Sequence, residues 1–326
     1  SAEFSRPGDG RIEILTRPGS PEYHGEVSFG IRDHRRDARN AFAARRPTEQ
    51  HRSLEGSLTG PLGRGKTTSF VLAASREEQD LQSVAYALTP AGPVRENVPS
   101  PQRDTSWSAR VTRQAGGSNT MSVQYDFERW RVPNDGIGGF ALPEAASDSG
   151  HDAHHLDYAL TTIATPRLIN LLRLRAGTSR SYTRSARPGV PSITVLDAFT
   201  GGGAQADYLG RELRVHLSDT LSWSRGKHFL QTGVSVPEFS RSSSTDQTNI
   251  DGTFSFATLD DYARGTPFSF LRQQGESHLA LGYKEIGWFV QDEIRIRPDL
   301  AMALGYFAEE GLDLYLGCEH LWGAAH

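Results

Sequence analysis

The residues closest to a known chemical motif are Gly60–Thr67, with the sequence GPLGRGKT. They match the phosphate-binding pattern G-x-x-x-x-G-K-[ST], and Asp197, after the strand-like run 193–196, could hold the metal ion of such a site. A working P-loop wraps phosphates at the N-terminus of a helix that follows a buried strand. Here the preceding segment is half polar and the following one alternates like a strand. We interpret the motif as a hairpin turn and keep a soluble P-loop nucleotide-binding enzyme as an alternative.

A second cluster with the right side chains for chemistry is His151, Asp152, His154 and His155. Imidazole and carboxylate groups both bind zinc, copper or iron. The cluster follows the stretch 132–151, which is rich in Gly, Asp and Ser and predicts a loop. Side chains that are adjacent on extended backbone point apart, so one ion could use only some of the four. We predict a metal site in an external loop here, with a solvated loop as the simpler interpretation.

Other kinds of chemistry have no support in the sequence. No Ser/His/Asp, paired-carboxylate or Cys/His arrangement stands out, so we expect neither an enzyme nor a cofactor. The single cysteine, Cys318, excludes an intrachain disulfide and a cysteine-rich metal site. The net charge of -4 gives no reason to expect a nucleic-acid partner.

The clearest structural signal is an alternation of apolar and polar residues from Tyr283 to Tyr306. Every second residue from Ile286 to Ile296 is apolar except Asp292, and the pattern resumes from Leu300. A period of two is the period of a strand with unlike faces. Because Pro298 presets its backbone and lacks a donor, it fits a tight turn. The stretch therefore predicts a long antiparallel hairpin.

The same alternation recurs along most of the chain, and glycine-rich or proline-containing turns separate the segments. The apolar members are Val27, Phe29 and Ile31; Phe70, Leu72 and Ala74; Trp107, Ala109 and Val111; Met121, Val123, Tyr125 and Phe127; Leu156, Tyr158 and Leu160; Leu168, Leu172 and Leu174; Leu213, Val215, Leu217, Leu221 and Trp223; Leu230, Val234 and Val236. Only 37% of the 326 residues are apolar, and the mean hydropathy is -0.50. No run approaches the ~18 apolar residues of a membrane helix. These features are typical of an all-β, antiparallel transmembrane β-barrel.

Strand length and loop length both favour a barrel over a soluble β-sandwich. The segment 209–223 would be roughly 50 Å long at ~3.4 Å per residue, whereas globular strands usually have about five or six residues. Short links are expected at 116–118, 165–167, 225–227 and 297–299, and long ones at 33–50, 76–104, 132–151, 176–208 and 237–277. Short turns on one side and long loops on the other are typical of outer-membrane barrels.

Two details of the barrel prediction concern single side chains. Asp219 falls on the lipid side of its strand, where we expect a local bulge to relieve it. Trp107, Trp130, Trp223 and Trp288 lie near strand ends or flank apolar stretches, as tryptophans at a membrane interface do.

Several segments, in order, make the chain resemble a TonB-dependent outer-membrane receptor of the large Oar-like kind. The matching segments are Ser1–Phe4 and Gly8–Gly19, Tyr23–Phe29, Arg32–Asp33 with Ala38–Asn40 and Phe42, Gly60–Leu62 with Lys66–Thr67, Gly252–Phe256 with Leu259, Asp261–Tyr262 and Gly265–Pro267, and Phe289–Leu300. The last is the best match.

This resemblance implies a plug end at residues 1–20 and a partial barrel of about twelve strands, out of about twenty-two, at residues 21–307. Residues 308–326 lose the alternation, and we expect a truncated or frame-shifted tail there. The implied location is the outer membrane. The implied partners are membrane lipid, the TonB energy-coupling complex acting through a region before residue 1, and a scarce ligand such as a siderophore, metal complex, peptide or oligosaccharide. A β-rich surface protein that does not transport is a further alternative.

Overall fold

The computed structural model describes residues 19–36, 41–43, 45–63, 67–297 and 300–310. Eleven long strands form one antiparallel sheet, and their bounds are β1 (His24–Asp33), β2 (Gln50–Pro61), β3 (Thr68–Asp80), β6 (Gln102–Ala115), β7 (Asn119–Asp135), β8 (Ser147–Thr165), β9 (Leu168–Ser185), β12 (Tyr208–Arg225), β13 (His228–Asp246), β16 (His278–Arg297) and β17 (Leu300–Glu310). The predicted all-β, antiparallel fold is confirmed. The predicted plug strand at residues 12–16 and residues 311–326 lie outside the described part.

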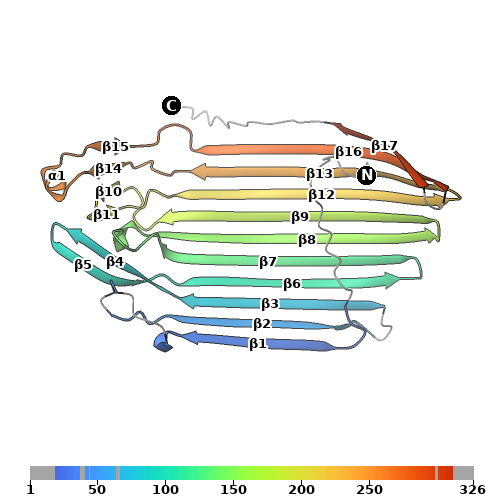
Figure 1. Ribbon diagram of the computed structural model, residues 1–326, viewed down its shortest axis with the longest axis horizontal. Coiled ribbons are helices and arrows are strands. Elements are labelled where there is room, and N and C mark those ends of the chain that lie inside the picture. Colours follow the sequence, from blue (N-terminus) through green and yellow to red (C-terminus); the bar gives the residue numbers. More distant parts are fainter. Residues whose placement is uncertain (1–18, 37–40, 44, 64–66, 298–299, 311–326) are drawn as a thin grey trace, which may run out of the picture.

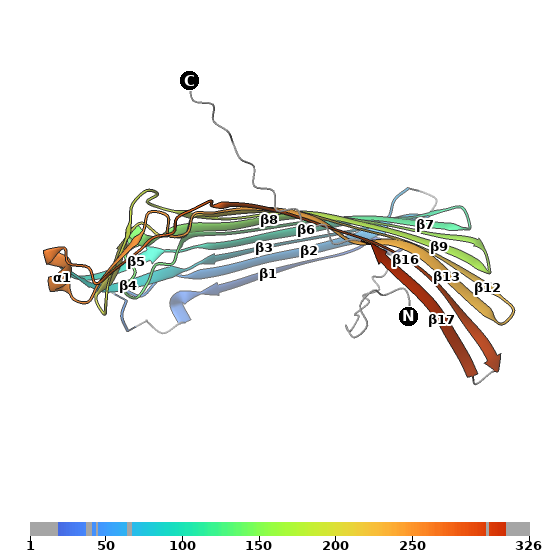
Figure 2. The same cartoon turned by 90° about the horizontal axis from the view of Figure 1, so that it is seen from above.

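The long strands are paired in the order in which they occur in the chain, as in an up-and-down barrel wall (Figure 1). Each pairs with the next by hydrogen bonds, and β1 and β17 form the two edges. Figure 2 shows that the sheet is curved, because both edges lie on the same side of the middle strands. An antiparallel, sequentially ordered and curved sheet is the geometry of an open section of a β-barrel.

The two ends of the sheet differ as the sequence predicts. At one end, β6 and β7, β8 and β9, and β12 and β13 are joined by links of two or three residues. At the other end lie the long connections 34–49, 81–101, 136–146, 186–207 and 247–277. These are shorter than predicted because the strands continue further, and β9 reaches Ser185 where 176–208 was expected to be loop. The strand β17 likewise runs to Glu310, into the predicted tail.

The two faces of the sheet are chemically unlike. On one face, which we call the outer face, large apolar side chains are exposed, among them Val27 at 78% and Val234 at 53%. Their rows follow the strand register, and one row is Val111, Val123, Tyr158, Leu174 and Leu217. The opposite, inner face carries polar residues on the same strands, such as Ser108, Gln124 and Asp157. An ordered sheet with one oily and one wet face needs an apolar medium on the first side.

The long connections between strands form a compact layer, which we call the head. It contains β4 (Gln82–Thr89) and β5 (Gly92–Pro99), a sheet of β10 (Ser192–Val195), β11 (Phe199–Gly202), β14 (Thr253–Phe256) and β15 (Ser269–Leu271), the helix α1 (Leu259–Arg264), and the 3-10 turn η2 (Pro143–Ala145). The 3-10 turn η1 (His34–Arg36) follows β1. Val195, Phe199 and Phe256 are at most 6% exposed and form its core with Ala87 and Ala198.

Backbone hydrogen bonds join the separate connections of the head to one another. The amide of Leu88 donates to the carbonyl of Ala198, and that of Leu142 donates to Thr200. The amide of Leu196 donates to the carbonyl of Phe256. Four connections from different parts of the sheet are thus packed as one unit. None of the described helices is long and apolar enough to cross a membrane.

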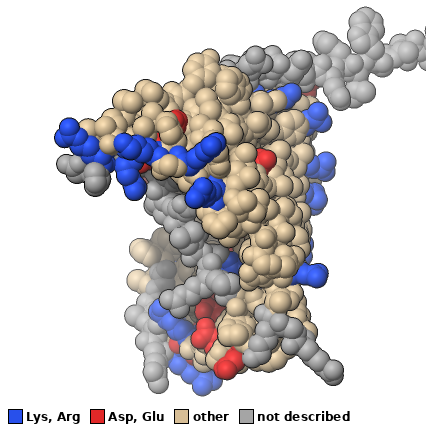
Figure 3. All heavy atoms as spheres, turned by 90° about the vertical axis from the view of Figure 1, so that its right-hand side faces the viewer, with Lys and Arg blue, Asp and Glu red and all other residues tan. Residues whose placement is uncertain are grey.

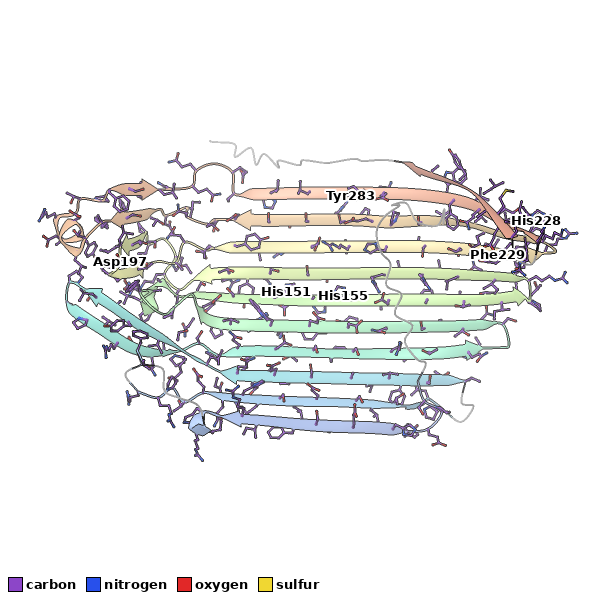
Figure 4. All side chains as sticks on the ribbon, in the orientation of Figure 1. His151, His155, Asp197, His228, Phe229 and Tyr283 are labelled. Carbon is purple, nitrogen blue, oxygen red and sulfur yellow. The ribbon has the colours of Figure 1, made fainter. Side chains whose placement is uncertain are left out.

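The phosphate-binding pattern spans the link between two antiparallel strands, and residues 64–66 within it lie outside the described part. Gly60 and Pro61 end β2, and Thr68 begins β3, so a strand and not a helix follows the motif. Asp197, its candidate partner, has a φ of 55° and lies in the head, at the end of the sheet away from that turn (Figure 4). The described residues on either side of the motif therefore lack the helix N-terminus that a P-loop requires.

The relief expected for Asp219 comes from a neighbour and not from a bulge at that residue. In the ladder with β9 the register is continuous, and the shift against β13 lies between Val215 and Leu217. Asp219 keeps its outward side, where its Oδ1 accepts a hydrogen bond of 2.6 Å from Nδ2 of Asn170. Each polar side chain thereby gives the other a partner on the apolar face.

Candidate functional site

The four residues predicted to bind a metal lie on β8, so their placement in an external loop is wrong. The strand begins at Ser147, and residues 147–155 are paired with β7 on one side and β9 on the other. Because side chains alternate along a strand, His151 and His155 point to the inner face and Asp152 and His154 to the outer face. Figure 4 shows His151 and His155 on the head-side half of β8.

This alternation divides the predicted ligands. Asp152 accepts hydrogen bonds from Nε of Arg129 at 2.7 Å and from Nη2 of Arg131 at 2.8 Å. The hydroxyl of Tyr125 lies 2.6 Å from Nδ1 of His154. His151 and His155 are four positions apart along the strand, so their backbones are about 13 Å apart. Among the described residues, no three His, Cys, Asp or Glu side chains are arranged to hold a metal ion. The metal site stays a prediction.

His151 contributes to a hollow on the inner face, close to the head. The hollow has a volume of about 640 Å³, and its lining residues include Asp104, Glu128, Trp130, Ser181 and Tyr208. Nδ1 of His151 lies 2.8 Å from the hydroxyl oxygen of Ser181. The register places Asp104, Trp130, His151 and Ser181 in one row across four strands. Two aromatic rings with carboxylates beside them suit a ligand that has a flat surface and positive charge.

A second hollow of about 580 Å³ continues this surface along the inner face. It shares Ser106 and Glu128 with the first, and it adds Glu26, Glu55 and Asp126. Hydroxyl groups lie between the carboxylates, and the oxygens of Ser75 and Ser106 are 2.8 Å apart. The inner face of β1–β7 is therefore mainly acidic and hydroxylated along the two hollows, and Arg32 and Arg110 are its inward arginines.

The inner face of the neighbouring strands carries both signs of charge. Arg175 donates to Asp157 at 2.6 Å, and Arg214 donates to Glu212 at 2.7 Å. These pairs neutralise one another locally. The carboxylates that line the two hollows, by contrast, all lie on β1–β7.

Sequence reasoning missed most of this surface. Trp130 was expected at a membrane interface, but it faces inward, whereas Trp107, Trp223 and Trp288 face outward. The sequence held a signal for the inward direction of Trp130. The apolar residues from Met121 to Phe127 have odd numbers, so the even-numbered Trp130 falls on the polar side of β7. The pairing of Asp104 with Trp130 could not be read from the sequence without the register.

The faces and the strand order agree with a comparison against protein families. A family model described as an outer membrane beta barrel domain matches residues 73–306. The chain belongs to this family. Its β-barrel section therefore lies in the outer membrane, with the outer face toward lipid and the inner face toward the lumen. No match is found among curated proteins.

Solved structures with the same fold include outer-membrane transporters and receptors. The outer membrane transporter YddB from Escherichia coli is 14% identical with a TM-score of 0.61, over 88% of this chain and 40% of YddB. FpvA from P. aeruginosa, bound to heterologous pyoverdines, is 11% identical with a TM-score of 0.52, over 82% and 37%. The siderophore receptor PirA from Acinetobacter baumannii is 12% identical with a TM-score of 0.50, over 90% and 39%. This chain spans about 40% of the length of these proteins.

Proposed function

We propose that this outer membrane β-barrel section is part of a TonB-dependent transporter and forms one side of its transport path. The observation that carries the proposal is the continuous polar surface of the inner face, which runs from the head along β1–β7. The outer face of the same strands is apolar, so water and solute have access to one side only. The fold shared with the transporter YddB supports this function.

In the proposed mechanism, the head and the first hollow capture a scarce ligand from outside the cell. Trp130 and Tyr208 offer aromatic surface, and Asp104 and Glu128 offer negative charge. Of the candidate ligands, a siderophore, metal complex, peptide or oligosaccharide, one with positive charge suits these groups best. Energy from the inner membrane would displace a plug, whose end we predict at residues 1–20, and the ligand would then pass along the acidic wall. This function requires no enzymatic step.

The test compares two adjacent positions on β6 in the complete receptor after removal of its plug. In a planar bilayer this protein should form a conducting channel. Ser108→Cys, which faces inward, should lose conductance on treatment with a charged, water-soluble methanethiosulfonate reagent. Ala109→Cys, which faces outward, should not respond.

Equal responses at the two positions would contradict a transport path along the inner face. A receptor that never conducts, with or without its plug, would favour the alternative of a surface protein that does not transport.

A further inference from the structure

The outward side chains of five adjacent strands change from apolar to polar or basic at nearly the same level. On the turn side of this level lie Phe127 on β7, Leu156 on β8, Ala176 on β9, Leu213 on β12 and Phe239 on β13. On the head side lie Arg129, Asp152 and His154, Thr178 and Arg180, Arg211, and Arg241, in the same strand order. Figure 3, which views the sheet from its turn end, shows basic groups projecting along the right-hand outline, opposite the hollowed side.

Two of these arginines face one another directly, and Asp152 lies opposite Arg180 on its other side. Arg211 is the direct cross-strand partner of Arg180, and both side chains are exposed. Like charges directly opposite on a sheet are destabilising. The nearest carboxylate in the row, Asp152, is held by Arg129 and Arg131. In the described part of the chain, no ion pair involves Arg180 or Arg211.

The unpaired arginines line a hollow of about 880 Å³ on the outer face. Its lining residues include Arg129, His154, Arg180, Arg211, Leu213 and Arg241, together with two carboxylates, Asp152 and Glu212. Both carboxylates are already in ion pairs, Asp152 with Arg129 and Arg131 and Glu212 with Arg214. Arg241 on β13 lies opposite Leu213, which is two residues closer to the turns than Arg211. An anion in this hollow could be reached by guanidinium groups from three neighbouring strands. Guanidinium groups bind phosphate through two parallel hydrogen bonds, which suits a phosphorylated ligand better than a simple counterion.

The position of the hollow identifies the kind of ligand. It opens toward lipid at the head side of the apolar rows, where the outer leaflet meets water. Directly on its turn side the same strands present Leu174 and Leu213, against which acyl chains can pack. A ligand that fits both parts has phosphate groups on a head and hydrocarbon chains below it.

We propose that this basic hollow is a binding site for a phosphorylated glycolipid of the outer leaflet. Its phosphates bridge Arg180, Arg211 and Arg241, and its acyl chains lie along the apolar rows of β9 and β12. Bound phosphate removes the repulsion between Arg180 and Arg211. The site is on the opposite face from the transport path and does not depend on the proposed function.

The test uses the complete receptor, purified in a neutral detergent and titrated with diphosphorylated lipid A, while bound lipid is counted by native mass spectrometry. The double variant Arg180→Gln/Arg211→Gln should bind this lipid at least tenfold more weakly than the unmodified protein. The matched control is Arg225→Gln, at the turn end of the outer face of β12, which should bind normally. Lipid A without phosphates should bind weakly and equally to all three proteins.

Folding of the double variant is checked by its heat-modifiable migration on gels, which should be unchanged because a repulsive pair has been removed. Two results would overturn the proposal. One is equal lipid A binding by the double variant and the unmodified protein. The other is displacement of the lipid by inorganic phosphate at an equal concentration, which would show a simple anion site.

Discussion

Val123→Arg is expected to lower the free energy of unfolding of the complete barrel by about 2–4 kcal/mol. Val123 lies on the outer face of β7, is 37% exposed, and occupies a row of apolar side chains that continues through Tyr158 and Leu174. A charged side chain there must leave water for lipid hydrocarbon. Urea titration of the receptor in lipid vesicles measures the loss.

The matched control for this substitution is the neighbouring residue. Gln124 faces the lumen, and its amide donates to both carboxylate oxygens of Asp126 at 2.9 Å. Arginine at this position keeps a donor for Asp126 and lies between Asp157 on β8 and Arg110 on β6, whose effects on a positive charge oppose one another. Gln124→Arg should therefore leave the stability within about 0.5 kcal/mol. Equal losses for the two variants would show that both faces meet the same medium.

Phe199→Ala is expected to open the head without unfolding the barrel. The ring of Phe199 is 4% exposed and packs edge-on against Tyr262, with their centroids 5.3 Å apart. Deleting a buried phenylalanine side chain costs about 3–5 kcal/mol, because a cavity replaces its contacts. At 1.4 kcal/mol per factor of ten, the open form of the head should become roughly a hundredfold more populated or more.

Thermolysin digestion measures this opening when cleavage is followed at the buried residues Val195 and Phe256, which the protease reaches only when the head opens. The control is Phe268→Ala, in the same head but 61% exposed, which should be digested at the normal rate. Barrel migration on gels should stay normal in both variants. Unchanged digestion of Phe199→Ala would show that the head is not held together by this core.

The sheet could be predicted because its two faces meet different media, so apolar and polar side chains alternate along each strand. From Met121 to Phe127, and from Leu213 to Trp223, one side chain in two meets an apolar medium, so the period of two is visible. Short turns such as 116–118 mark where such segments end. These two signals were sufficient for the fold class and for the side of the long connections.

The same alternation explains why the head-side ends of the strands and the head itself were not predicted. On the head side of the apolar rows neither face of a strand meets hydrocarbon. The end of β9 therefore has the sequence TSRSYTRS, in which apolar and polar residues do not alternate. Such segments were expected to be loops, and the cluster of His151 to His155 was placed in a loop for this reason. The head was not predictable because β10 pairs in parallel with β14, far along the chain, and only the register brings Phe199 to Phe256.

The division of the barrel wall into a lipid side and a water side is tested most directly by single cysteines from Leu213 to Ser218 on β12, in the complete receptor without its plug or its other cysteines. We predict that cysteines at 214, 216 and 218 react with a charged, water-soluble maleimide, whereas those at 213, 215 and 217 react only with a lipid-soluble reagent. Reaction of all six with the water-soluble maleimide would contradict a lipid-facing side, and so would the reverse alternation.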